Sequence, residues 1–242
     1  MLLEIAVFNI SSAMLAAHAG ADRLELCENP ADGGTTASYG TLKIIREKIL
    51  IPVFPIIRPR GGDFLYSDEE FEVIKKDIAL CKSLGFEGIV IGLLNVDGTI
   101  DTQRTKQLVH LSYPLEVTFH RAFDRAAEPL KALEDIIHSG CQRILTSGQV
   151  PGAFDGKELI KKLIEQAGER IIIMPGSGIR SNNINDLAAY TGAVELHSSA
   201  RKLIPSTMHY SNKFMKEEIE NLSVDTEEIK RMKSLLDALE KE

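Results

Sequence analysis

Eight short apolar segments with β-propensity alternate with amphipathic, helix-like stretches along this chain. The predicted strands are residues 3–8, 23–27, 53–58, 88–93, 116–119, 143–146, 171–174 and 193–197. The stretches with helical spacing are residues 11–20, 39–48, 67–85, 99–110, 129–139, 156–167 and 182–190. Strands that alternate with helices pair in parallel through right-handed crossovers, and eight such units close a barrel. We therefore predict an α/β fold, a (β/α)8 TIM-like barrel.

The chain has 242 residues, a length at which a barrel forms one domain, so we assign residues 1–242 to a single TIM-like barrel domain. Within it, residues 202–242 are predicted to be a loop followed by a C-terminal helix, with residues 201–221 polar and irregular. The predicted helix begins at Asp225, which with Glu228 resembles a capping box. An open, doubly wound sheet is the alternative fold, but its GxGxxG fingerprint is absent after the first strand.

The composition excludes several classes of protein. A net charge of −7 disfavours nucleic-acid binding, because most of the surface repels phosphate. The longest apolar run, residues 49–57, contains two prolines and is too short to cross a membrane. Residues 1–7 show no basic leader, and the three cysteines are widely spaced, so we expect a cytoplasmic protein without disulfides. The expected partner is a small-molecule or metal ligand.

Polar residues within the predicted strands are expected to point into the barrel, since the other strand face packs on helices. Strand alternation places on inward faces Glu4, Arg23, Glu25, Cys27, Phe54, Ile56, Arg58, Glu116, Thr118, His120, Glu195 and His197. Buried charges must be paired, so we expect Glu4 and Glu195 to be structural partners of an arginine or histidine. Glu25, Arg58 and His120 end their strands, where barrel enzymes place their sites.

The densest group of polar residues follows the fifth strand, in residues 118–124. Its His120 and Asp124, together with Glu25 and Arg58, are the candidate catalytic residues. In this interpretation His120 and Glu25 exchange protons, Asp124 orients the histidine, and Arg58 holds an anionic group.

Loops after the later strands are typical of an anion site, because barrels often bind anions through backbone N–H groups after strands seven and eight. A tight strand-to-helix connection or a surface turn explains the same residues almost as well. The candidate anion-binding residues are Arg60, Thr146, Ser147, Gly176, Ser177, Gly178 and Ser198.

Six motifs together resemble the CutC family over nearly the whole chain. They are RLELC (23–27), GGTTASYG (33–40), IRPRGGDF (57–64), TFHRAFD (118–124), LTSG (145–148) and MPGSGI (174–179). The resemblance implies a TIM-like barrel, a cytosolic protein, a homodimer or homotetramer, and a link to copper homeostasis.

The resemblance also implies copper ligation by cysteine, and Cys27 lies in the matching motif. The chain departs from the family pattern at Ser177, which interrupts a glycine triplet, and no cysteine follows the eighth strand. Two hypotheses therefore stay open. One is a copper homeostasis protein that binds Cu(I) through Cys27 with help from other chains or a histidine. The other is a barrel enzyme acting on a small anionic substrate, a phosphate or carboxylate.

Overall fold

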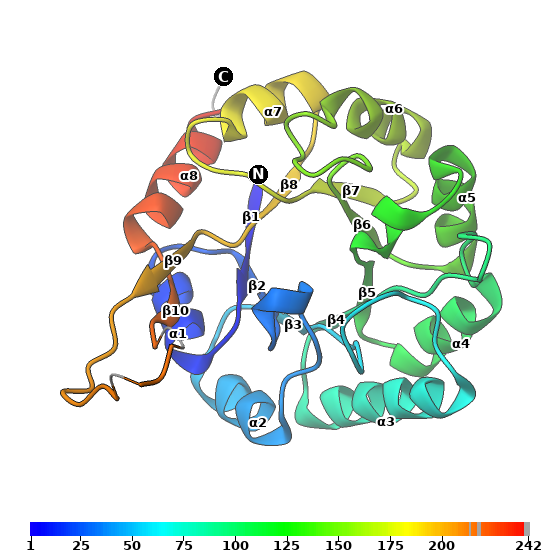
Figure 1. The fold of residues 1–242 in the computed structure, drawn as a ribbon. Helices are drawn as coiled ribbons and strands as arrows, with labels where there is room; N and C mark the ends of the chain where they lie inside the picture. The colour runs from blue at the N-terminus through cyan, green and yellow to red at the C-terminus, as the bar shows by residue number, and fades with distance from the viewer. Residues whose placement is uncertain (213, 217–218, 240–242) are drawn as a thin grey trace.

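The computed structural model describes residues 1–212, 214–216 and 219–239, and it contains a closed ring of parallel strands (Figure 1). The strands are β1 (Leu2–Val7), β2 (Arg23–Leu26), β3 (Val53–Pro55), β4 (Gly88–Ile91), β5 (Glu116–Phe119), β6 (Arg143–Thr146), β7 (Ile172–Pro175) and β8 (Glu195–Ser198). They form two four-stranded parallel sheets, β3-β2-β1-β8 and β4-β5-β6-β7. Parallel bridges join the sheets, between Ile56 and Val90 and between Gly176 and His197. The predicted (β/α)8 barrel is confirmed.

An outer ring of helices surrounds the strands (Figure 1). The helices are α1 (Ile10–His18), α2 (Tyr39–Lys48), α3 (Asp68–Leu84), α4 (Thr102–Ser112), α5 (Pro129–Ser139), α6 (Lys157–Ala167), α7 (Ile184–Thr191) and α8 (Thr226–Leu239). Local signals explain their ends: a capping box of Ser67 and Glu70 starts α3, and Gly85, with φ of +78°, ends it. Within the described residues, no helix is long and apolar enough to span a membrane.

The segment after β8 differs from the irregular loop expected there. Strands β9 (Arg201–Ile204) and β10 (Asn221–Val224) pair as an antiparallel ribbon that projects from the barrel (Figure 1). The ribbon is anchored at its base, where Asn9 donates a hydrogen bond to the carbonyl of Leu222. The strands are short and mostly exposed, so the binary pattern that marks a half-buried strand is missing. The predicted helix start is confirmed, because the Asp225 carboxylate accepts the N–H of Glu228.

Apolar side chains separate into two groups on opposite faces of the barrel wall. The larger cluster lies between strands and helices and includes Leu3, Ile5 and Leu24. A small cluster lies inside the ring, made of Cys27, Phe54, Ile56 and Val90, with Phe8 packed against it. The rest of the interior contains buried charged groups, as the strand alternation predicts.

Two further short elements position the candidate site. They are the 3₁₀ turns η1 (Pro30–Asp32), which follows β2, and η2 (Arg121–Arg125), which follows β5. Both lie at the carboxyl-terminal end of the barrel, since they come directly after the last residues of their strands.

Candidate functional site

Five charged residues from the first half of their strands form an ionic network inside the barrel. Arg23 pairs with Glu4 and, through Nη2, with Oε2 of Glu195 at 2.5 Å. Arg143 Nε lies 3.0 Å from the same Glu195 oxygen, and its Nη1 lies 2.8 Å from Glu116 Oε2. The predicted structural role of Glu4 and Glu195 is thus confirmed, because both carboxylates neutralise buried guanidinium groups.

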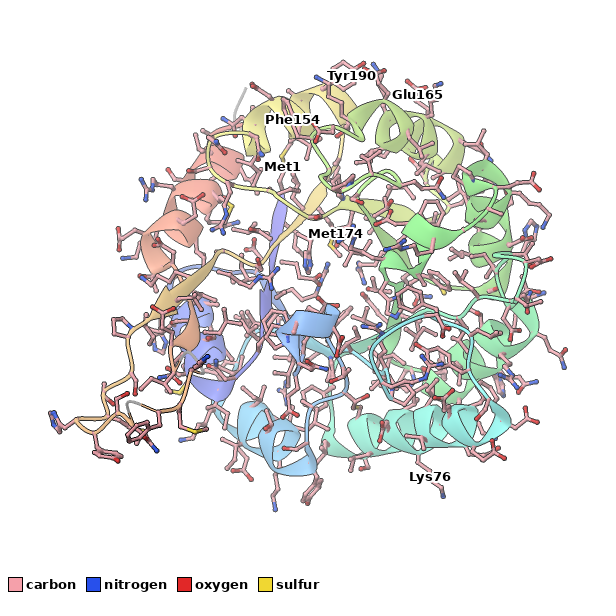
Figure 2. All side chains as sticks on the ribbon, viewed as in Figure 1. Met1, Lys76, Phe154, Glu165, Met174 and Tyr190 are labelled. Carbon is pink, nitrogen blue, oxygen red and sulfur yellow. The ribbon has the colours of Figure 1, made fainter. Side chains whose placement is uncertain are left out.

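Phe54 completes this network, lying between its two arginines. The Cζ atoms of Arg23 and Arg143 lie 4.9 and 5.3 Å from the Phe54 ring centroid. The ring occupies space left by Gly88, where a Cβ atom would lie closer than 3.0 Å to it. Met174 extends into the same region, and its sulfur accepts from Arg23 at 3.3 Å (Figure 2). These side chains pack together in the amino-terminal half of the barrel interior.

Above this network, His197 lies between two carboxylates. Its Nδ1 is 2.8 Å from Glu4 Oε1, and its Nε2 is 3.7 Å from Glu25 Oε2. Burial tends to raise the pKa of Glu4, but the charge of Arg23 and the hydrogen bond to His197 outweigh it and lower the pKa to about 2. Burial also dominates at Glu25, where it raises the pKa to about 7 against the charge of His197.

The pKa of His197 itself is raised. Burial opposes the charged imidazolium, but the hydrogen bond to Glu4 and the charge of Glu25 outweigh that cost. The imidazole of His197 therefore lies between Glu4, which stays ionised, and Glu25, which titrates near neutral pH. Separated pKa values of this kind are typical of acid and base pairs in enzymes.

Cys27 follows Glu25 on the same face of β2 and is 1% exposed. Burial, and then the charge and hydrogen bond of Glu25, raise the pKa of the Cys27 thiol well above its ordinary value. The thiol therefore stays protonated at neutral pH, the opposite of a metal-ligating thiolate.

The residues present do not form a copper site within one chain. Cu(I) prefers several soft sulfur ligands, with imidazole next. The other two cysteines lie elsewhere: Cys81 is in α3 and Cys141 precedes β6. Among the described residues, no three side chains of His, Cys, Asp or Glu group closely enough to hold a metal ion.

His120 ends β5 and is buried, and its ring lies against the backbone of Gly92. A Cβ atom at Gly92 would lie closer than 3.0 Å to this ring. Nδ1 accepts the N–H of Ala122 at 3.1 Å, so the proton of the neutral ring lies on Nε2. Burial and the charge of Arg58 lower the pKa of His120 to about 3. His120 is thus a neutral hydrogen-bond donor at physiological pH.

Arg58 lies three residues beyond the end of β3, and its terminal nitrogens donate hydrogen bonds to backbone carbonyls. Nη1 donates to the carbonyls of Asp32 and Gly34 at 2.6 and 2.9 Å, and Nη2 donates to that of Gly62 at 2.8 Å. These bonds hold the loops after β2 and β3 together. The guanidinium charge remains at the site, but its outer edge is engaged by protein carbonyls.

Several buried polar atoms here have no hydrogen-bond partner in the described part of the chain: Arg58 Nε, His120 Nε2, Thr118 Oγ1 and the hydroxyl of Tyr66, which lies beside Arg58. Phe64 lies between the first two, with its ring centroid 4.9 Å from Arg58 Cζ and 5.0 Å from the His120 ring. Buried donors without acceptors are costly. Their presence at strand ends indicates a site for a ligand that supplies acceptor oxygens.

Asp124 does not orient His120 as expected. Its carboxylate accepts from Thr146 Oγ1 at 2.5 Å, from the N–H and Oγ of Ser147, and from Arg121 Nε at 2.7 Å. Asp124 therefore joins η2 to the loop after β6, and the Thr146 and Ser147 hydroxyls expected to face an anion point to this carboxylate instead. The sequence could not reveal this pairing, because the two loops meet only in the barrel.

Arg60, also expected to bind an anion, is paired with carboxylates on the surface. Its Nε lies 2.5 Å from Glu70 Oε1, and its Nη2 lies 3.0 Å from Asp63 Oδ1. The alternative of a surface turn therefore describes Arg60 better than an anion site.

The loops after β7 and β8 remain partly available for an anion. The Ser177 hydroxyl donates to the Pro151 carbonyl and the Ser198 hydroxyl donates to that of Ile179, so neither offers its proton to a ligand. The Gly176 N–H is engaged by the Thr146 carbonyl. Gly178 is exposed, with φ of +71°. An anion site there stays a prediction.

Sequence reasoning did not assign roles to His197, Gly88 and Gly92. His197 alternates with Glu195 on the inward face of β8, and this was its only signal. The two glycines have ordinary φ values, so space and not backbone conformation requires them. A glycine at an inward-facing strand position indicates that another side chain lies close to the strand backbone.

Two surface pockets in the described part of the chain lie away from this site. One of about 730 Å³ opens at the amino-terminal end, beside Glu116 and Arg143, and one of about 540 Å³ lies on the helical exterior beside His110. The unpartnered donors locate the candidate site better than surface shape does, because the mouth of the barrel is covered.

Comparisons with known proteins agree on one family. The CutC family model matches residues 1–202. A CutC family protein of Chromobacterium violaceum is 51% identical over 209 residues, covering 86% of this chain and 85% of that protein. The human copper homeostasis protein cutC homolog is 48% identical, covering 87% of this chain and 77% of its own length. A crystal structure of CutC from Streptococcus agalactiae has a TM-score of 0.78 at 33% identity, covering 82% of this chain and 98% of that one. The chain therefore belongs to the CutC family.

Proposed function

We propose that this protein is an enzyme that transfers a proton to or from a carbon atom of a small anionic substrate, a carboxylate or phosphate, at the carboxyl-terminal end of its barrel. The observation that carries the proposal is the pair of carboxylates on either side of His197. Glu4 stays ionised, with a pKa of about 2, and Glu25 titrates near neutrality, with a pKa of about 7. A group with a pKa near the working pH is the most effective general acid or base.

Each residue of the site has a distinct role in this proposal. Glu25 takes up or releases the proton. His197, held by Glu4 at 2.8 Å, tunes Glu25 through its charge. The Nε2–H of His120 and the Nε–H of Arg58 donate to substrate oxygens, where they stabilise developing negative charge. Because His120 is neutral, it acts as a donor and does not compete with Glu25 as the base.

Isotope exchange tests this proposal whatever product the reaction forms. The protein is incubated in D₂O with a panel of small carboxylates and phosphate esters, and deuterium incorporation at carbon is followed by NMR. We expect incorporation into one chemical class, loss of exchange in Glu25→Gln, and weaker binding in His120→Ala. Glu47→Gln, on the exposed surface of α2, is the matched carboxylate control. Exchange that survives Glu25→Gln, or none with either class, would reject the proposal.

A second candidate function is the handling of Cu(I), which the name of the human relative favours. Cys27 is the thiol available in the site, and further ligands would have to come from another copy of the chain, in the homodimer or homotetramer that the resemblance implies. The buried, protonated state of Cys27 beside Glu25 does not favour this function.

Titration with Cu(I) against a competing chelator, under anaerobic conditions, separates the two functions. If the protein handles copper, wild type competes strongly and Cys27→Ser does not. If it is the enzyme proposed above, both bind weakly and alike, and Cys27→Ser retains isotope exchange.

A further inference from the structure

We propose that residues 29–34 form a lid over the mouth of the barrel and that Arg58 is the latch that holds it closed. The inference concerns access to the site and goes beyond the proposed function. It does not require the reaction to be known.

The position of the segment provides the first support. The short turn η1 lies inside the outline of the strand ring, on the side of β2 and β3, in the view of Figure 1. The site residues Glu25, Cys27 and His120 are 5%, 1% and 4% exposed. A Cβ atom at Gly34 would lie 3.2 Å from the Cys27 sulfur, so the segment packs directly on the thiol. A ligand therefore reaches the Cys27 sulfur from this side only if the segment moves.

The backbone of the segment is built as a loop with a fixed base. Glu28 and Thr35 exchange two backbone hydrogen bonds of 2.9 Å, which close the loop where it leaves the barrel. Within it, Asn29, Gly33 and Gly34 have φ values of 51°, 80° and 104°. No residue of η1 is buried, so displacing it exposes little apolar surface.

Polar contacts, and not apolar packing, therefore hold the loop in place. Two of the three carbonyls bound by Arg58 belong to it, those of Asp32 and Gly34, and the third, of Gly62, belongs to the loop after β3. The Asp32 side chain lies against Gly61, where a Cβ atom would be closer than 3.0 Å to it. The Arg58 guanidinium is thus the side chain that hydrogen-bonds to both loops, and the Asp32–Gly61 contact adds to it.

Arg58 also connects the lid to the site. Its Nη1 binds two lid carbonyls and its Nη2 binds the loop after β3, while its Nε is buried without a partner among the described residues. An anion that meets Nε neutralises the same group that holds the lid closed. This coupling rests on the proposed function, whereas the lid itself does not.

Thiol labelling tests the lid, with Cys27 as a natural reporter. The protein is exposed to iodoacetamide under native conditions, and labelling at each cysteine is read by peptide mass mapping. Cys81, fully buried in α3, reports global unfolding. We expect Cys27 to be labelled at least about tenfold faster than Cys81, with little dependence on denaturant, as for a local opening.

Variants at two neighbouring arginines test the latch. Arg58→Lys keeps the charge but removes donors, and we expect it to accelerate labelling of Cys27 about tenfold while Cys81 is unchanged. Arg60→Ala, in the same loop but paired with Glu70 and Asp63, is the matched control and is expected to have no effect. The lid is refuted if wild-type Cys27 and Cys81 are labelled together, and the latch is refuted if Arg60→Ala acts like Arg58→Lys. Loss of isotope exchange would affect neither result.

Discussion

Replacing Glu25 with glutamine is expected to stabilise the protein at alkaline pH and to change little at acidic pH. The pKa of Glu25 is about 7 in the folded protein and near 4.5 when unfolded, so folding favours its protonated form. Its stabilising contribution is fully present below pH 4.5 and is lost as the pH rises through 7. Glutamine keeps the shape of the protonated carboxyl but does not ionise.

The magnitude follows from the pKa difference. At about 1.4 kcal/mol per unit, the shift from 4.5 to about 7 corresponds to roughly 3 kcal/mol. We therefore expect the free energy of unfolding of Glu25→Gln, relative to wild type, to increase between about pH 4 and about pH 8 by a value of this order. Loss of the interaction with His197 in the variant reduces the gain, so about 3 kcal/mol is an upper value.

Urea denaturation of both proteins at several pH values measures this difference. Glu47→Gln removes the same charge from the exposed surface of α2 and controls for net charge. A difference between Glu25→Gln and wild type that stays constant with pH would show that Glu25 titrates normally, and the assignment of Glu25 as the proton carrier would then be wrong.

Further predictions concern the packing and the ionic network of the interior. Gly92→Ala should lower the free energy of unfolding by about 1–3 kcal/mol, because its Cβ displaces His120, whereas Gly40→Ala, with open space around it, should raise it by up to about 1 kcal/mol. Equal effects in thermal or urea denaturation would contradict the close packing on His120. Arg23→Ala should cost about 3–5 kcal/mol, since it leaves buried carboxylates unpaired; a cost below about 1 kcal/mol would contradict the ionic network. The low pKa of Glu4 stabilises the protein above pH 4.5, and we expect this stabilisation to be lost as the pH falls toward 2, measured as the difference from Glu4→Gln.

Much of the fold could be predicted from the sequence because two periodicities reinforce each other. Strands alternate with helices, and inward residues alternate with outward ones within each strand. The same alternation identified Glu4 and Glu195 as partners of a buried arginine, since a charge inside a barrel requires a counter-charge. Glu25, Arg58 and His120 were assigned to the site by their positions at strand ends.

Interactions between loops could not be predicted in this way. Arg58 donates to backbone carbonyls, and Asp124 accepts hydrogen bonds from hydroxyl groups. These partners lie in loops that come together only once the barrel has closed. A backbone carbonyl leaves no signal in the sequence, so Arg58 looked available to a ligand when most of its donors are used. The ribbon of β9 and β10 was missed because exposed strands lack an alternating pattern.

The central claim is that Glu25 exchanges a proton near neutral pH while Glu4 stays ionised beside it. NMR titration of the glutamate side-chain carboxyl carbons measures this directly, with the Glu25 signal assigned by its absence in Glu25→Gln. The account predicts a midpoint near 7 for Glu25 and an ionised Glu4 down to about pH 2. A Glu25 midpoint near the ordinary value of 4.5 would contradict it.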